Sequence, residues 1–243
     1  TLLAKTQQNQ KNLIIIIARG GMDGLAAVPP RNNLELEGCR PNIFVKNPIN
    51  LTSDFNLHPS LKTFETLWHN NKAAVVHATN IPYTGRSHFD GQNLMESGGH
   101  VPYQELTGWL GRGIDEAGFE GLSISLPIPL LLRGTNNSDN FFPTMMEKPS
   151  NKIMHIIADH YASDKKLKGA MDRIQARPLS MTESVMGRNK IHRDFSFLTG
   201  IAGAQMAKPN GPRVAVFEVF GFDTHAAQGG RNGLLDQKLG VID

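Results

Sequence analysis

The chain has 243 residues, of which 40% are apolar and 19% charged, and its formal net charge is +3. This length favours one domain with a sizeable core. The 25 basic residues are dispersed rather than gathered with aromatic residues, which argues against nucleic acid as a partner. No apolar run approaches the roughly 18 residues of a membrane span. The single cysteine, Cys39, excludes an internal disulfide and a thiolate metal site.

The first apolar run, residues 13–18, contains four consecutive isoleucines and predicts a β-strand. Because its successive positions are all apolar, the run is typical of a strand buried inside a sheet that is covered on both faces. A glycine-rich turn follows at residues 19–24 and allows the backbone to approach a ligand closely. This turn places Asp23 at the carboxyl end of the strand, where open α/β sheets bind ligands.

The remaining chain alternates predicted strands and helices. Further strands are expected at residues 73–78 and 213–219, with a broken extended segment over residues 123–132. Helical periodicity is expected in six stretches: from Pro59 to about residue 68, and over residues 86–96, 106–117, 150–161, 182–206 and 234–243. The alternation predicts a three-layer α/β/α sandwich with a mainly parallel sheet.

Two further expectations concern the helical stretch over residues 150–161 and the extent of the domain. The stretch over residues 150–161 has a cap at Ser150 and an apolar stripe that is expected to be buried. The last helical pattern has no capping glycine or closing strand. We therefore expect residues 1–243 to form a single domain that is truncated at its C-terminus.

Asp23 and the pair Asp223 and His225 are candidate metal ligands. A carboxylate at a strand end suits a hard divalent cation, although an aspartate also commonly forms turns. Asp223 and His225 follow a predicted strand and are two residues apart, so both side chains lie on one face of an extended segment. Asp and His ligands suit zinc or manganese. A purely structural hydrogen-bonded pair is the alternative.

Ser87 is a candidate nucleophile at the start of the helix over residues 86–96. A hydroxyl at a helix N-terminus lies beside unpaired N–H groups and the positive end of the dipole, which favours bound phosphoryl oxygens and an alkoxide. Arg86 could hold an anion in a bidentate contact. In the alternative interpretation Ser87 only caps the helix, Asp90 completes a capping box, and His88 is a surface residue.

Several motifs together resemble the DUF1501 family, a bacterial group related to the alkaline phosphatase and sulfatase superfamily. The matching segments are spread over nearly the whole chain: ARGGMDGL at 18–25 with Val28 and Pro29, LHPSL at 57–61, AVVHA at 74–78, RSHFDGQ at 86–92, MESG at 95–98, GWLGR at 108–112, and FDTH at 222–225 with Gln228.

The resemblance implies an alkaline phosphatase-like fold with a two-metal site at the carboxyl edge of the sheet. Asp23 would match the first-strand metal ligand, Ser87 the nucleophile that also touches one metal, and Asp223 with His225 ligands of the other metal. The ions would be divalent: zinc, manganese, magnesium or calcium. Family members continue to an Asp-His-Gly-His-type segment with the remaining ligands, which does not occur in these 243 residues.

These features lead to one expected function and two alternatives. The expected function is metal-dependent hydrolysis of a small anionic phosphate or sulfate ester, and the resemblance adds twin-arginine export and an extracytoplasmic, periplasmic location. One alternative is a non-catalytic exported protein that binds a metal or ligand. The other is a phosphomutase-type transferase, which would use the same site.

Overall fold

The structure is a computed structural model that describes residues 11–125, 127–141, 149–176, 195–226 and 228–243. The chain divides into two compact units. One comprises residues 1–141 and 195–243, and the other comprises residues 142–194. The larger unit contains all the candidate site residues.

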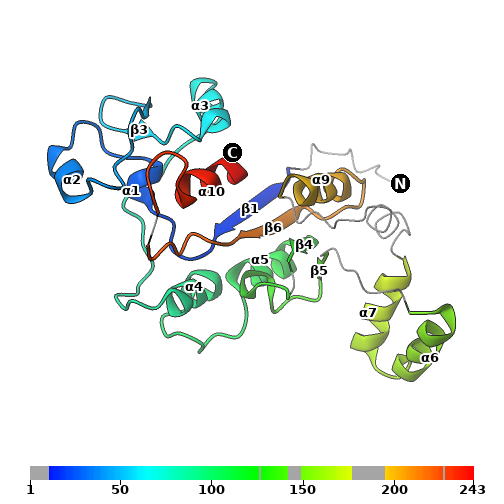
Figure 1. Cartoon of the computed structure of the whole chain (residues 1–243). Helices are drawn as coiled ribbons and strands as arrows, with labels where there is room; N and C mark the ends of the chain where they lie inside the picture. The colour runs from blue at the N-terminus through cyan, green and yellow to red at the C-terminus, as the bar shows by residue number, and fades with distance from the viewer. Residues whose placement is uncertain (1–10, 126, 142–148, 177–194, 227) are drawn as a thin grey trace, which may run out of the picture. The chain divides into compact units, whose positions relative to one another are not determined.

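A four-stranded parallel sheet forms the centre of the larger unit (Figure 1). The strands lie in the order β1, β6, β4, β5 and span Leu13–Ala18, Val214–Val219, Gly121–Ile124 and Ser138–Asn140, respectively. β1 and β6 pair over their full lengths, from Leu13 with Val214 to Ala18 with Val219. Their carboxyl ends are therefore level. The mixed α/β class and the mainly parallel sheet that the sequence predicts are confirmed.

Strand β6 is buried on both faces because its apolar side chains alternate between two helical layers. Val214 and Val216 pack in one cluster with side chains of α5 (Trp109–Ala117) and the 3₁₀ turn η1 (Leu130–Leu132). Ala215 and Phe217 pack in another cluster with α9 (Phe195–Met206). Successive strand side chains point to opposite faces, so an uninterrupted apolar run suits this position.

Strand β1 has the predicted bounds but not the predicted burial. Only Ile17 of the strand is buried, whereas Leu13, Ile14 and Ile16 are 46%, 55% and 39% exposed. Within the described residues, β1 pairs with β6 on one side and lies at the edge of the sheet. An edge strand has neighbours on one side only, so its side chains are covered less than those of β6.

Two short strands and four helices pack around the carboxyl side of β1 and β6. The strands, Ile49–Asn50 (β2) and Asn56–Leu57 (β3), form an antiparallel pair. The helices are α1 (Gly24–Ala27), α2 (Leu34–Cys39), α3 (Lys62–His69) and α10 (Leu234–Ile242). Ala26 and Ala27 of α1 pack with Leu235 and Leu239 of α10. This cluster fixes the turn after β1 against the C-terminal helix.

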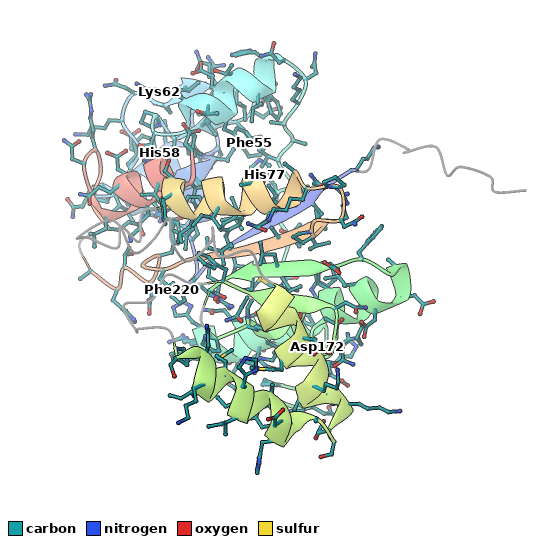
Figure 2. All side chains as sticks on the ribbon, turned by 90° about the vertical axis from the view of Figure 1, so that its right-hand side faces the viewer. Phe55, His58, Lys62, His77, Asp172 and Phe220 are labelled. Carbon is teal, nitrogen blue, oxygen red and sulfur yellow. The ribbon has the colours of Figure 1, made fainter. Side chains whose placement is uncertain are left out.

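The strand expected at residues 73–78 is absent, and that prediction is wrong. These residues have no regular structure, and Val76 is 76% exposed. The ring of His77 stacks on Phe55, with centroids 4.0 Å apart (Figure 2). Apolar β-branched residues favour an extended backbone, but a strand also needs a partner to pair with.

The helix that carries Ser87 is confirmed. It is α4, spans His88–Ser97, and has Ser87 as its N-cap. It ends at Gly98, whose left-handed backbone (φ +71°) closes the last turn. The helix expected over residues 182–206 is described only from Phe195, where α9 begins, and its earlier part lies outside the described residues.

The smaller unit contains α6 (Asn151–Tyr161), capped by Ser150 as predicted, and α7 (Lys165–Ala176). The apolar stripe of α6 is not buried, which corrects the prediction: Ile153 and Ile156 are 49% and 59% exposed. Contact with one neighbouring helix leaves much of a helix surface uncovered.

None of the helices in the described ranges is both long and apolar enough to cross a membrane.

Candidate functional site

The glycine turn after β1 brings together three segments that are distant in the sequence. Gly20 has a φ of +108°, and a Cβ atom there would lie 2.4 Å from the backbone nitrogen of Asp223. Gly21 has a φ of +78°, and a Cβ atom there would lie 2.9 Å from the ring of His88. Both positions need glycine, for the backbone conformation and for space. The turn therefore lets the segment after β6 and the start of α4 meet at the carboxyl edge of the sheet.

The carboxylate of Asp223 lies between two imidazole rings. His88 Nε2 is 3.3 Å from Asp223 Oδ1, and His225 Nε2 is 2.9 Å from Asp223 Oδ2. The two rings lie edge to face, with centroids 6.4 Å apart. The Asp223 side chain is 40% exposed, so the group is open to solvent. A carboxylate in this position orients both imidazoles.

Asp23 is held by a separate set of contacts. It caps α1 by accepting a hydrogen bond from the Ala26 N–H at 3.2 Å, and its carboxylate forms an ion pair with Arg40. Gln228 Nε2 also donates to Asp23 Oδ2, at 2.6 Å. Burial alone would raise the pKa of Asp23, but the contacts with Arg40 and Gln228 outweigh it and lower this pKa below the ordinary aspartate value.

Gln228 links Asp23 to the segment that contains Asp223. Its Oε1 accepts a hydrogen bond of 3.2 Å from Thr224 Oγ1, while its Nε2 donates to Asp23. Residues 205 positions apart in the sequence are thus joined by one side chain. Asp23 reaches the neighbourhood of Asp223 indirectly, through this amide.

Ser87 precedes His88 in the sequence, and its side chain and backbone N–H form hydrogen bonds with Asp90 and Tyr83. Its Oγ accepts a hydrogen bond of 3.2 Å from the Asp90 N–H, as expected for an N-cap. The backbone N–H of Ser87 donates to the Tyr83 hydroxyl at 3.3 Å. Arg86 lies on the exposed loop before the helix. The cap that the sequence predicts is present, and the hydroxyl hydrogen of Ser87 is still available for donation.

Sequence reasoning missed two participants, His88 and Arg40. Only the alternative interpretation of this segment assigns His88 a place, as a surface residue; its side chain is 44% exposed, yet it lies against both Gly21 and Asp223. Its position next to a capping serine was a weak signal, since nothing in the local sequence identifies Asp223 as its partner. Arg40 lies in a loop without periodicity, and no local pattern relates it to Asp23.

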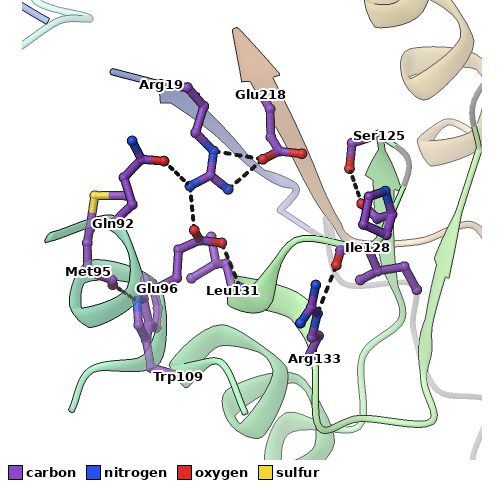
Figure 3. Close-up of polar contacts among 11 residues, drawn as sticks. Arg19, Gln92, Met95, Glu96, Trp109, Ser125, Ile128, Leu131, Arg133 and Glu218 are labelled. Atoms are coloured by element: carbon purple, nitrogen blue, oxygen red, sulfur yellow. Dashed lines mark hydrogen bonds and ion pairs between the residues drawn. The ribbon is translucent and has the colours of Figure 1, made fainter. Parts of the chain in front are cut away.

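A buried ion group lies beside the site, between α4 and the ends of β1 and β6 (Figure 3). Arg19 forms ion pairs with Glu96 and Glu218, and each of the three side chains is at most 10% exposed. Glu96 also accepts the Leu131 N–H at 3.0 Å, and Gln92 accepts from Arg19 at 2.9 Å. Burial opposes the charge of Arg19, but the two carboxylates raise its pKa. The group fixes α4 to the sheet edge.

The donor types at the site suit a transition metal, but the donors are engaged with one another. Imidazole nitrogen and carboxylate oxygen are preferred ligands of zinc and manganese. In the part of the chain that the structure describes, no group of three or more His, Cys, Asp or Glu side chains is arranged to hold an ion. For Asp23 to act as a ligand, its carboxylate would have to exchange contacts with Arg40 or Gln228.

Comparison with known proteins found no matching family model, no matching curated protein and no matching solved structure.

Proposed function

We propose that this protein hydrolyses small phosphate or sulfate esters at the carboxyl edge of its sheet, within a three-layer, alkaline phosphatase-like domain. One observation carries the proposal. The glycine turn after β1, the start of α4 and the segment after β6 meet at Gly21, His88 and Asp223. The three sequence segments with chemically suggestive residues therefore share one solvent-accessible place.

Ser87 is the proposed nucleophile. Its Oγ would form a bond to phosphorus or sulfur while the bond from that atom to the ester oxygen breaks. The N-terminus of the ten-residue helix α4 provides unpaired N–H groups and a positive dipole end for the remaining oxygens. Arg86, on the exposed loop before the helix, would bind the same anion. Water would then hydrolyse the seryl ester and release phosphate or sulfate.

His88, whose imidazole lies against Asp223, is the proposed proton carrier. The His88 ring would accept the Ser87 hydroxyl proton and return it to the leaving oxygen, while the Asp223 carboxylate holds the ring in place. Divalent ions, when bound, would stabilise the attacking and leaving oxygens. Asp223, His225 and Asp23 are the residues that would hold them. Membership of the DUF1501 family and an extracytoplasmic location are part of the same proposal and rest on the sequence resemblance.

Substitution of Ser87 tests the nucleophile. With p-nitrophenyl phosphate and p-nitrophenyl sulfate as probes, we expect both Ser87→Ala and Ser87→Asn to abolish turnover. Asn retains an N-cap acceptor, so this variant separates loss of the nucleophile from loss of the cap, which costs about 1 kcal/mol. Ser150→Ala removes a comparable cap from α6 and is expected to leave turnover unchanged. Normal turnover in both Ser87 variants would refute the assignment.

A non-catalytic binding protein is the second candidate, and the contacts of Asp23 favour it. Arg40 and Gln228 already satisfy this carboxylate, as expected if its role is structural. Metal content measured by mass spectrometry on the purified chain distinguishes the candidates. Two bound transition-metal ions per chain support the hydrolase, whereas none, together with no turnover, supports the binding protein.

A further inference from the structure

A cavity of about 420 Å³ opens at the carboxyl ends of β1, β6 and β4, beside the candidate site. This volume falls in the range of roughly 300–1,000 Å³ that is usual for small-molecule sites. Its lining residues come from the strand ends, from α4, from the segment between α4 and α5, and from η1 and the residues that flank it. No step of the proposed ester hydrolysis uses this cavity.

The floor of the cavity carries a net negative charge. Arg19, Glu96 and Glu218 all line it, so one guanidinium is shared by two carboxylates. Their side chains are 10%, 5% and 10% exposed. A group of this kind in a region of reduced dielectric favours the approach of a further cation.

Glu218 is the carboxylate that can accept from a ligand. Arg19 Nε and Nη2 both bind its Oε1, at 2.7 and 2.5 Å. Both oxygens of Glu96, in contrast, accept hydrogen bonds, from Arg19 and from the Leu131 N–H. In Figure 3 the second oxygen of Glu218 is directed away from Arg19.

The remaining lining residues, which form the outer wall of the cavity, do not reverse the net negative charge of its floor. They include Arg133, whose Nε donates to the Ile128 carbonyl at 3.0 Å, and Glu105. Two arginines and three glutamates in the whole lining leave one negative charge in excess.

Aromatic side chains surround the charged floor. Phe89, Tyr103 and Phe220 line the cavity and are 79%, 58% and 63% exposed (Phe220 is labelled in Figure 2). Exposed rings grouped around one cavity indicate a surface that a ligand covers. Aromatic faces attract cations as well as apolar groups.

We propose that this cavity binds a small organic ammonium ion with an apolar body. The ammonium group would lie at Glu218, and the apolar body would lie against Phe89 and Phe220. The inference does not depend on ester hydrolysis, and either proposal can fail without the other.

Calorimetric titration of the 243-residue chain with three probes of matched shape tests the charge preference. The probes are 3-phenylpropylammonium, the neutral 3-phenylpropan-1-ol and the anionic 3-phenylpropanoate, all at neutral pH. We expect the ammonium to bind at least about tenfold more tightly than the alcohol, and the carboxylate more weakly than both.

Two substitutions that change the charge of the cavity lining in opposite directions locate the binding. Glu218→Gln removes the negative excess and is expected to weaken ammonium binding about tenfold. Arg133→Gln removes a cation from the wall and is expected to tighten the same binding severalfold, a gain that partial unfolding cannot produce. Lys208→Gln removes a positive charge outside the lining and is expected to leave the affinity unchanged.

The proposal is overturned if none of the probes binds, if the ammonium and the alcohol bind equally, or if the carboxylate binds most tightly. Weaker ammonium binding in Arg133→Gln would also overturn it. If Glu218→Gln does not fold, as judged by its thermal unfolding midpoint, the Arg133 variant and the probe series still decide the question.

Discussion

Asp23 shows how one carboxylate can combine local and long-range roles. It caps α1, pairs with Arg40 and accepts a hydrogen bond from Gln228. We expect Asp23→Asn to lower the free energy of unfolding by about 1–3 kcal/mol, since it removes the charged partner of a partly buried arginine. Urea unfolding measures this change. Asp54→Asn, at an exposed carboxylate, is the control and should change the stability by less than about 0.5 kcal/mol. Equal effects would show that the Arg40 contact does not stabilise the fold.

Asp23 also makes the stability of the fold depend on pH. The pKa of Asp23 is lowered in the folded state relative to the ordinary aspartate value of about 3.9. Its stabilising contribution is therefore present above that value and is lost as the pH falls through the lower folded-state pKa. Between pH 6 and pH 2, the stability difference between the wild type and Asp23→Asn should shrink. Asp236, whose pKa is also lowered, is present in both proteins, so its contribution cancels in the stability difference between them. A difference that is constant with pH would contradict the assignment.

At the scale of elements, α4 is positioned by the buried ion group as well as by its apolar face. Glu96, in the last turn of α4, is paired with Arg19 at the end of β1 and accepts the Leu131 N–H of η1. We expect Glu96→Ala to cost about 3–5 kcal/mol, because it leaves a buried arginine and a buried N–H without this partner. Chemical unfolding measures the loss. Glu65→Ala, in an exposed pair with His69, should cost less than about 0.5 kcal/mol. A small loss for Glu96→Ala would mean that packing alone holds α4.

At the scale of the whole molecule, stability depends on β6, which pairs with β1 from the first residues of the described chain and with β4 from its middle. Phe217 is 2% exposed and packs edge to face on Phe195, with centroids 5.6 Å apart. We expect Phe217→Ala to cost about 3–5 kcal/mol. Ile14→Ala, at a β1 position that is 55% exposed, should cost less than about 1 kcal/mol. Unfolding midpoints in guanidinium chloride compare the two variants. A comparable loss at Ile14 would show that both faces of β1 are covered in solution.

Elements whose signals are local follow from the sequence alone. The isoleucine run defined β1, the serine cap defined the start of α4, and the apolar run before Gly221 defined β6. Backbone propensity and capping act within a few residues, so contiguous sequence carries them. The sequence also identified Asp23, Ser87, Asp223 and His225 as residues that follow strands or begin helices. Their chemical roles remain predictions.

Which of these residues meet depends on the folded chain as a whole. The tertiary structure placed β1 at the sheet edge, left residues 73–78 unpaired, and joined His88 to Asp223 and Arg40 to Asp23. The ion pair of Arg19 and Glu218 joins residues 199 positions apart. Such contacts depend on strand order and on how loops pack, which are set by the summed burial of the whole chain rather than by any segment of it. The glycine turn was visible in the sequence, but its purpose, to let Asp223 and His88 approach, became clear only in three dimensions.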